Sequence, residues 1–197
     1  MNWIALTKPK QIHGLRQFSG FTLLELVLTM LTVGVLVAIA TPSMVTLIKN
    51  NRSDALAEEL SVALQIARTE AIKRGERVSL CGANAAMTDC GGNWTDGWLV
   101  VTDNATTDGA AAVVVGEVIA QFGEPHEDSV ISADNNGAVS FVRYTSLGEL
   151  ARIGGLNNTA PIVFTAYMEG CTGARQRQIT VGVAGMMNVS KSECPGY

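Results

Sequence analysis

A long apolar run near the N-terminus dominates the pattern of hydrophobic and polar positions. From Leu26 to Ala40 the chain carries no charge, and its only polar side chains are Thr29 and Thr32. Counted from Phe21, the run reaches roughly 20 residues, the length that a helix needs to cross the hydrocarbon core of a bilayer. The run therefore predicts a helix that is apolar on every side and suited to a membrane.

The pattern becomes amphipathic after Pro42 and stays helical. Apolar positions now recur at three- and four-residue steps: Leu56, Leu60, Leu64, Ala67 and Ala71. Lys73-Arg74-Gly75 reads as a helix end, with cations in the last turn and a glycine for a left-handed cap. One helix over residues 21–74, about 80 Å long at 1.5 Å per residue, is predicted, with a kink at Pro42 because proline removes a backbone hydrogen bond.

Beyond Gly75 the pattern indicates strands. Six short segments are rich in β-branched residues: 77–80, 97–101, 112–119, 139–142, 161–167 and 178–183. Turn sequences with Gly, Asn and Asp separate them, for example at 103–109 and 134–137. The predicted fold class is α+β, with one long N-terminal helix packed on an antiparallel β-sheet domain.

A resemblance appears at the start of the apolar run, where Ser19–Leu26 reads S-G-F-T-L-L-E-L behind a leader with three basic residues and no acid. This resembles the class III leader junction of type IV prepilins and type II secretion pseudopilins. The resemblance implies that a prepilin peptidase cleaves between Gly20 and Phe21 and that the new N-terminal Phe21 is methylated. It also implies that Glu25, at the fifth mature position, pairs in the filament with the amino group of a neighbouring Phe21.

Glu25 decides between this interpretation and two simpler ones. An ordinary signal peptide cleaved after Ala38-Ile39-Ala40 or a plain signal anchor would also explain the apolar run. A carboxylate in lipid costs on the order of 3 kcal/mol, so Glu25 is expected to have a function. Neither a signal peptide nor a signal anchor gives this residue one. The basic leader holds the N-terminus in the cytoplasm, so the rest of the chain is expected in the periplasm.

A second resemblance lies in the predicted β-domain. The W-x-x-G-W sequence that begins at Trp94 and ends at Trp98, with the hydrophobic run after it, is similar to the GspH/FimT group of minor pilins and pseudopilins. The resemblance implies the pilin-like lollipop outline, and we favour a core role for both tryptophans over a ligand groove. One departure is that Gly185 precedes Met186, where many relatives have Gly-Arg. The expected division is a cleaved leader at 1–20, a transmembrane and filament-core helix at 21–50, and a periplasmic head at 51–197 whose amphipathic helix half ends at about 75.

Charge and cysteines refine this picture. Without the leader, the chain holds 11 basic and 18 acidic residues, a net charge of −7. Only the C-terminal third, from Phe141, has more bases than acids. The four cysteines allow three pairings in the oxidising periplasm, of which we favour the local pairs Cys81–Cys90 and Cys171–Cys194. Their spacing does not fit zinc, so no metal site is expected.

No catalytic constellation is visible. His126 is the only histidine beyond the leader, and the chain lacks nucleotide-binding, nucleophile-elbow and metalloprotease motifs. The sequence predicts neither an enzyme nor a cofactor.

Together these patterns predict a minor pilin of a type IV pilus, acting in a priming or tip complex. Its expected partners are other pilins, the prepilin peptidase and the inner-membrane assembly platform. The alternatives are a pseudopilin of a type II secretion system and a DNA-binding minor pilin of natural transformation. Arg175, Arg177 and Lys191 are the candidate DNA contacts, but Ala174 interrupts the Gly-Arg-x-Arg element that the resemblance would require.

Overall fold

The computed structural model describes residues 20–153 and 156–195, so residues 1–19 of the expected leader lie outside the described residues. The chain divides into two compact units, residues 1–41 and 42–197. Helix α1, Leu23–Arg74, contributes to both units, and its backbone is helical through Pro42. The kink expected at that proline stays a prediction.

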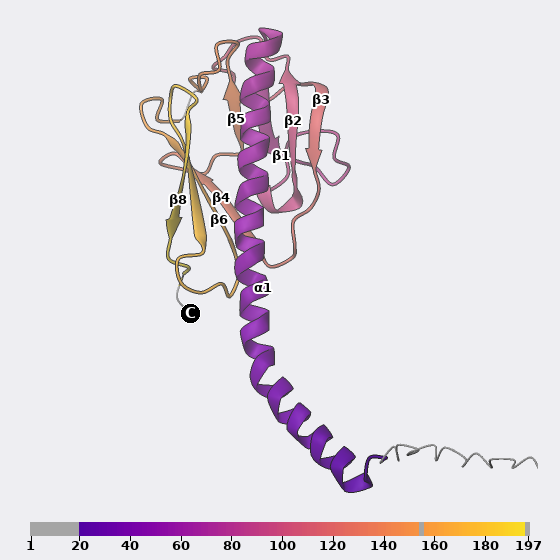
Figure 1. Cartoon of the computed structure of the whole chain (residues 1–197). Helices are drawn as coiled ribbons and strands as arrows, with labels where there is room; N and C mark the ends of the chain where they lie inside the picture. The colour runs from indigo at the N-terminus through magenta and orange to yellow at the C-terminus, as the bar shows by residue number, and fades with distance from the viewer. Residues whose placement is uncertain (1–19, 154–155, 196–197) are drawn as a thin grey trace, which may run out of the picture. The chain divides into compact units, whose positions relative to one another are not determined.

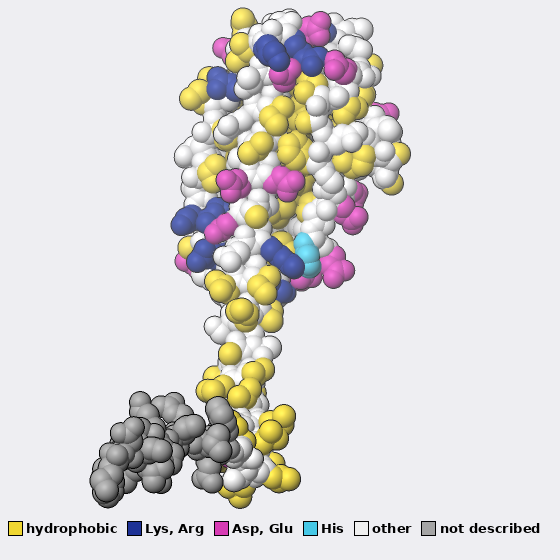
Figure 2. Space-filling view, turned by 45° about the vertical axis from the view of Figure 1, so that its right-hand side comes forward, with side chains coloured by type: hydrophobic (Ala, Val, Ile, Leu, Met, Phe, Trp, Pro, Cys, Tyr) yellow, Lys and Arg dark blue, Asp and Glu magenta, His cyan; other side chains and the backbone are white. Residues whose placement is uncertain are grey.

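In the first unit, α1 is apolar and uncovered. Its side chains from Leu23 to Ala40 are exposed, and by length and composition this part of the helix is able to cross a membrane. Figure 2 shows these apolar side chains, whereas acidic and basic side chains gather on the second unit. A helix that exposes apolar groups on all sides needs lipid or other helices as its surroundings.

In the second unit, α1 buries one face. Its apolar stripe is buried as the three- and four-residue spacing predicts: Leu56, Ala57, Leu60, Ala63, Leu64, Ala67 and Ala71. The helix ends where expected, because Gly75 takes a positive φ of 67° and its N–H donates to the Ala71 carbonyl at 3.0 Å. A side chain at Gly75 would be strained in this left-handed conformation.

Two antiparallel sheets pack with this helix (Figure 1). The first has the order β3-β2-β1-β5 and contains β1 Val78–Gly82, β2 Trp98–Asp103, β3 Val115–Phe122 and β5 Phe141–Tyr144. The second has the order β4-β6-β7-β8 and contains β4 Ser129–Asp134, β6 Ile162–Met168, β7 Gln176–Val181 and β8 Met187–Ser192. One hydrophobic core joins the helix stripe to residues of both sheets, so the α+β class is confirmed.

The strands differ from the prediction in three ways. The sheet is divided in two, and β4 and β8 were not predicted. Strand β8 is mostly exposed and lies at a sheet edge, so its sequence lacks the apolar alternation that marks a strand. Strand β3 begins at Val115 rather than at residue 112, because the Ala112 carbonyl binds the Arg143 side chain of β5 and the Val114 N–H binds the Asp103 side chain of β2.

The two tryptophans of the W-x-x-G-W sequence are core residues. Trp98 is fully buried and stacks on Phe122 with ring centroids 5.8 Å apart. Trp94, in the 3-10 helix η1 Trp94–Asp96, meets the edge of Phe164 at 5.1 Å and so joins η1 to the second sheet. Gly97 has a φ of 102°, and a Cβ there would lie 2.6 Å from the Phe122 carbonyl oxygen. The glycine thus permits the close turn that places both rings inside.

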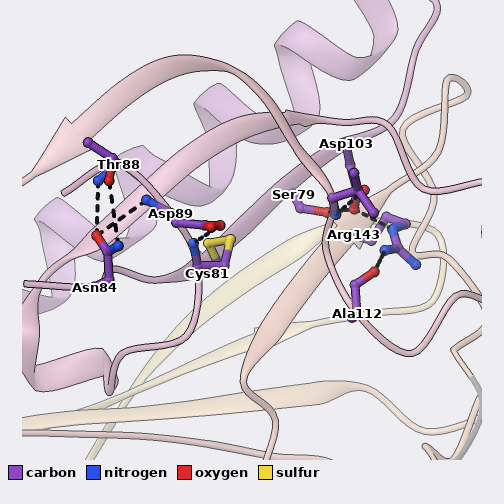
Figure 3. Close-up of a disulfide and its surroundings, with 10 residues drawn as sticks. Ser79, Cys81, Asn84, Thr88, Asp89, Asp103, Ala112 and Arg143 are labelled. Atoms are coloured by element: carbon purple, nitrogen blue, oxygen red, sulfur yellow. Dashed lines mark hydrogen bonds and ion pairs between the residues drawn. A yellow bond between two sulfur atoms is a disulfide. The ribbon is translucent and has the colours of Figure 1, made fainter. Parts of the chain in front are cut away.

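A buried ion pair fixes the loop between β2 and β3 (Figure 3). Arg143 Nε donates to Asp103 Oδ2 at 2.7 Å, and neither side chain is exposed. Ser79 Oγ donates to the same carboxylate oxygen at 2.6 Å. The remaining guanidinium nitrogens donate to loop carbonyls, including that of Ala112 at 2.7 Å. Both charges are therefore surrounded by hydrogen-bond partners, the condition under which a buried pair is tolerated.

Burial by itself would raise the pKa of Asp103, but the hydrogen bonds to its carboxylate outweigh this effect and lower the pKa. Ser79, Arg143 and the backbone N–H groups of Val114 and Ala105 together hold the pKa of Asp103 below its usual range. A carboxyl whose pKa is lowered by folding stabilises the folded state above its unfolded pKa of about 3.9. That contribution disappears as the pH falls through the folded pKa.

We expect Asp103→Asn to destabilise the unit 42–197 by about 3–5 kcal/mol at pH 7, because it leaves the buried Arg143 guanidinium without a counter-charge. As the pH falls below the unfolded pKa of about 3.9 towards the lowered pKa of the folded protein, the wild type loses the stability that this carboxylate contributes, so the difference between the two proteins should narrow. Urea denaturation at pH 7 and pH 3 measures both values. Asp108→Asn, which removes an exposed partner of Arg77, is the control and should cost less than about 1 kcal/mol. A difference that does not change with pH would contradict this account.

Candidate functional site

The predicted cleavage junction lies on exposed, non-helical chain directly before α1. Gly20, Phe21 and Thr22 are all exposed, and the first helical residue is Leu23. Thr22 caps the helix, since its Oγ1 accepts the N–H of Glu25 at 3.2 Å. Threonine followed three residues later by glutamate is the sequence of a capping box. The helix thus begins just after the junction because of the same residues that form the junction motif.

Glu25 stands alone among apolar neighbours. It lies in the first turn of α1, where the helix dipole favours a negative charge. Leu24, Leu26 and Leu28 around it are exposed and apolar. No ion pair to Glu25 occurs within the described residues. A carboxylate on an apolar helix without an ion-pair partner among the described residues is suited to pairing with a cation of another molecule.

A second polar feature of α1 was not predicted from the sequence. We call it the polar latch, and it consists of Lys49, Asn50, Ser53 and Asp54. Ser53 Oγ accepts the Met168 N–H at 2.9 Å, and Asn50 Oδ1 accepts the Thr172 N–H at 3.2 Å. Lys49 Nζ donates to the Glu169 carbonyl at 2.8 Å and lies 3.4 Å from Asp128 Oδ2. The latch holds α1 to the turn between β6 and β7 at the start of the packed part of the helix.

The structure brings the candidate DNA contacts close together but pairs two of them internally. Asp54 of the latch accepts from Arg175 Nη1 at 3.0 Å and from Arg177 Nη2 at 2.5 Å. The Arg177 side chain is only 11% exposed. Lys191 lies directly opposite Arg177 on β8 and is exposed. One carboxylate therefore pairs with both arginines and offsets one of their two charges, which lowers their capacity to bind phosphate.

Two disulfides close local loops. Cys81 pairs with Cys90 and Cys171 pairs with Cys194, with Cα–Cα distances of 5.6 and 5.9 Å. These are the pairings favoured from the sequence. The bridge between Cys171 and Cys194 ties the segment after β8 to the β6–β7 turn, beside the residues that the latch holds. Constraining this turn stabilises the site at which the helix is attached.

Comparison with known families identifies the chain. Residues 56–185 match the family described as Type II transport protein GspH. The chain belongs to the GspH family. Members of this family are structural subunits of the minor pilin and pseudopilin type. The match covers the amphipathic part of α1 and most of both sheets, so it is independent of the junction motif before Leu23.

Solved structures agree on the fold. The type IV minor pilin FimU of Pseudomonas aeruginosa is 18% identical with a TM-score of 0.54, over 71% of this chain and 89% of FimU. The minor pseudopilin EpsH of the Vibrio cholerae type 2 secretion system is 13% identical with a TM-score of 0.47, over 71% of this chain and 97% of EpsH. At this identity the similarity to FimU supports the pilin-like fold alone. No curated protein matches the sequence.

We expect the unit 42–197 to bind duplex DNA only weakly, above micromolar Kd, at physiological salt. Asp54 pairs with both Arg175 and Arg177 and offsets one of their two positive charges, and binding through three cations would weaken with salt at a slope of roughly −3 on a log–log plot. Mobility shift of the wild type and of Arg175→Ala/Arg177→Ala measures this. Micromolar binding by the wild type that the double variant loses would instead support DNA capture.

Proposed function

We propose that this protein is a minor pilin that assembles into a type IV pilus after removal of its leader. The observation that carries the proposal is an exposed apolar helix that begins at a prepilin-like junction and presents an unpaired Glu25. Membership of the GspH family supports assembly rather than catalysis as the way in which the protein acts.

The proposed sequence of events follows the two halves of α1. The first part, residues 21–50, anchors the protein in the inner membrane while the head, residues 51–197, lies in the periplasm. The prepilin peptidase cleaves between Gly20 and Phe21, and the assembly platform then moves the helix from lipid into a filament. Both environments are apolar, so the same exposed side chains suit both. The two disulfides fit an oxidising compartment.

Glu25 sets the register in this proposal. On leaving lipid, its carboxylate pairs with the amino group of Phe21 on an adjacent subunit. An uncompensated charge among packed apolar helices is costly, so only a register that brings the two groups together is stable. The pilin partners in a priming or tip complex are recognised through this pairing and through the apolar surface of α1.

A pseudopilin of a type II secretion system is the second candidate function. The description of the matching family favours it directly. Both systems require the same junction, helix and head, so the distinguishing observation is the gene neighbourhood. Neighbouring genes for secretion components would make the pseudopilin the leading proposal. DNA capture is less favoured, because Asp54 already pairs with Arg175 and Arg177.

Leader removal is the first test. We expect the intact mass of the protein purified from bacterial membranes to correspond to loss of Met1 to Gly20 and addition of one methyl group. The junction is exposed and non-helical on its described side, as a peptidase substrate must be. A mature chain that begins at Thr41 would establish a conventional signal peptide instead.

The second test concerns Glu25. Glu25→Ala should insert in the membrane as the wild type does, yet its content in sheared filaments should fall at least about tenfold. The variant leaves the amino group of Phe21 on the adjacent subunit buried without a counter-charge, which costs about 3–5 kcal/mol. Immunoblots of membranes and sheared filaments provide both values. Glu59→Ala, an exposed acid in the second part of the same helix, is the matched control and should leave filament content unchanged. Equal incorporation of Glu25→Ala would remove the role proposed here.

A further inference from the structure

A groove lies between α1 and the turn that joins β7 to β8. We call it the Tyr144 groove, and its lining includes Leu64, Arg68, Thr69, Tyr144, Met186 and Met187. Its volume is about 340 Å³, and it is open to solvent. All of these residues belong to the unit 42–197. The groove is large enough to receive side chains of another protein.

The floor of the groove contains a polar group without a partner. Tyr144 is only 1% exposed, and its side chain lines the groove. Within the described residues, no hydrogen bond to the Tyr144 hydroxyl is found, whereas the buried Trp94 indole and Ser79 hydroxyl both have partners. Burial raises the pKa of Tyr144, so the hydroxyl keeps its proton at neutral pH and is able to donate it in a hydrogen bond. Unlike the Trp98 indole N–H, which is fully buried without a partner, the Tyr144 hydroxyl reaches the solvent of the groove, so it is available to a group that enters from outside.

Arg68 supplies a positive charge beside this hydroxyl. Its Nε donates to the Gly148 carbonyl at 3.0 Å and its Nη2 to the Ala184 carbonyl at 3.3 Å. Its Nη1 has only the sulfur of Met186, a weak acceptor, at 3.3 Å. Lys73, Arg74 and Arg77, further along the chain, all pair with carboxylates, but no carboxylate of the described residues pairs with Arg68. The guanidinium is thus positioned by carbonyls and keeps donors for a carboxylate.

The rim of the groove is apolar. Ile72, Leu147 and Met186 are 52%, 77% and 63% exposed. Met186 lines the groove, Ile72 lies beside Gly148, and Leu147 precedes Gly148 in the chain. A Cβ at Gly148 would lie 2.6 Å from Ile72 Cδ1, and a Cβ at Gly185 would lie 1.9 Å from the Gly148 carbonyl oxygen. Exposed apolar side chains around an unpaired cation are typical of a protein interaction surface.

We propose that the Tyr144 groove receives an aspartate or glutamate side chain, flanked by apolar residues, from a neighbouring pilin-like subunit. This inference rests on the proposed function. The carboxylate pairs with Arg68 and accepts the hydrogen bond of the Tyr144 hydroxyl, while the flanking residues cover Ile72, Leu147 and Met186. Charge complementarity favours this occupant, and the apolar rim favours a protein segment over a phosphate backbone.

The experiment uses the full chain in the bacterium that produces it. A photo-crosslinking amino acid, p-benzoylphenylalanine, replaces the exposed Gln65 that lines the groove. Irradiation followed by mass spectrometry should give an adduct with one other pilin-like subunit, at a segment that contains Asp or Glu. Arg68→Gln should lower the adduct yield roughly tenfold, as loss of one partner of a desolvated charge pair does. Arg52→Gln is the matched control, an exposed arginine of the same helix without a carboxylate partner in the described chain, and should leave the yield unchanged.

Tyr144→Phe separates docking from folding. The hydroxyl has no hydrogen-bond partner among the residues that the structure describes, so its removal should leave the melting temperature unchanged or slightly raised. Docking loses a hydrogen bond, and the adduct yield should fall severalfold. A purely structural Tyr144 would give the opposite pattern, a lower melting temperature with an unchanged yield, and would overturn the proposal.

Reversal of charge completes the test. Arg68→Glu should abolish the adduct, and replacement of the crosslinked acid of the partner by arginine should restore it. An adduct with nucleic acid or lipid, an adduct indifferent to Arg68→Gln, or no adduct would overturn the inference. The content of this protein in sheared filaments of the same strains distinguishes failure of this inference from failure of the proposed function. Normal content without an adduct contradicts only this inference, whereas an acid-dependent adduct confined to the membrane contradicts pilus assembly and supports docking.

Discussion

Burial of one face of α1 is the constraint on which the second unit depends. The stripe alternates leucines with alanines, and Leu60, Ala63, Leu64, Ala67 and Ala71 are almost completely removed from solvent. Alanines allow strands to approach the helix backbone, while each fully buried leucine contributes about 1.5–3 kcal/mol. Residues of both sheets pack against this single stripe. The first sheet has a second, smaller apolar cluster, which includes Leu99, Val101 and Phe141, but the main core of both sheets contains the helix stripe.

Polar contacts close the two ends of this packed region. At its start, the polar latch accepts hydrogen bonds from the backbone N–H groups of Met168, the last residue of β6, and of Thr172 in the turn after it. At its end, Gly75 takes the left-handed conformation, and Glu70 pairs with Lys73 and Arg74. Between these ends the core is apolar. Because the latch and the cap are hydrogen-bonded and directional, they specify where along the helix the sheets lie, which apolar burial alone does not.

The features predictable from the sequence are those whose causes are local. The helix stripe, its end at Gly75 and six strands follow from periodicity and turn residues within a few positions. Strand β8 escaped prediction because an edge strand needs few apolar residues. The polar latch was not predicted for another reason. In the sequence, Ser53 and Asp54 look like ordinary polar helix residues, and their partners come from β6 and β7, which are distant in the chain. The junction and the role of Glu25 can be proposed from the sequence because one contiguous motif carries their chemistry, and both stay predictions.

The Tyr144 groove lies beyond such reasoning for a further physical reason. Its residues come from α1, from β5 and from the turn after β7, and nothing local marks Arg68 as different from other arginines. The difference appears only when the partners of the cations are compared. Arg143 is compensated inside the domain and Arg175 and Arg177 by the latch, so the basic character of the C-terminal third is largely internal.

This distribution of charge bears on how a head of this kind can associate. Once its own acids have compensated most of its cations, the outer surface is dominated by negative charge, which opposes close approach of similar acidic surfaces. Association must then rely on apolar burial, which the exposed part of α1 provides without direction. A single uncompensated cation set in an apolar rim adds direction at little cost, because one carboxylate in one orientation satisfies it. Helix burial would thus supply affinity, and sites such as Glu25 and Arg68 would select the register and the neighbour.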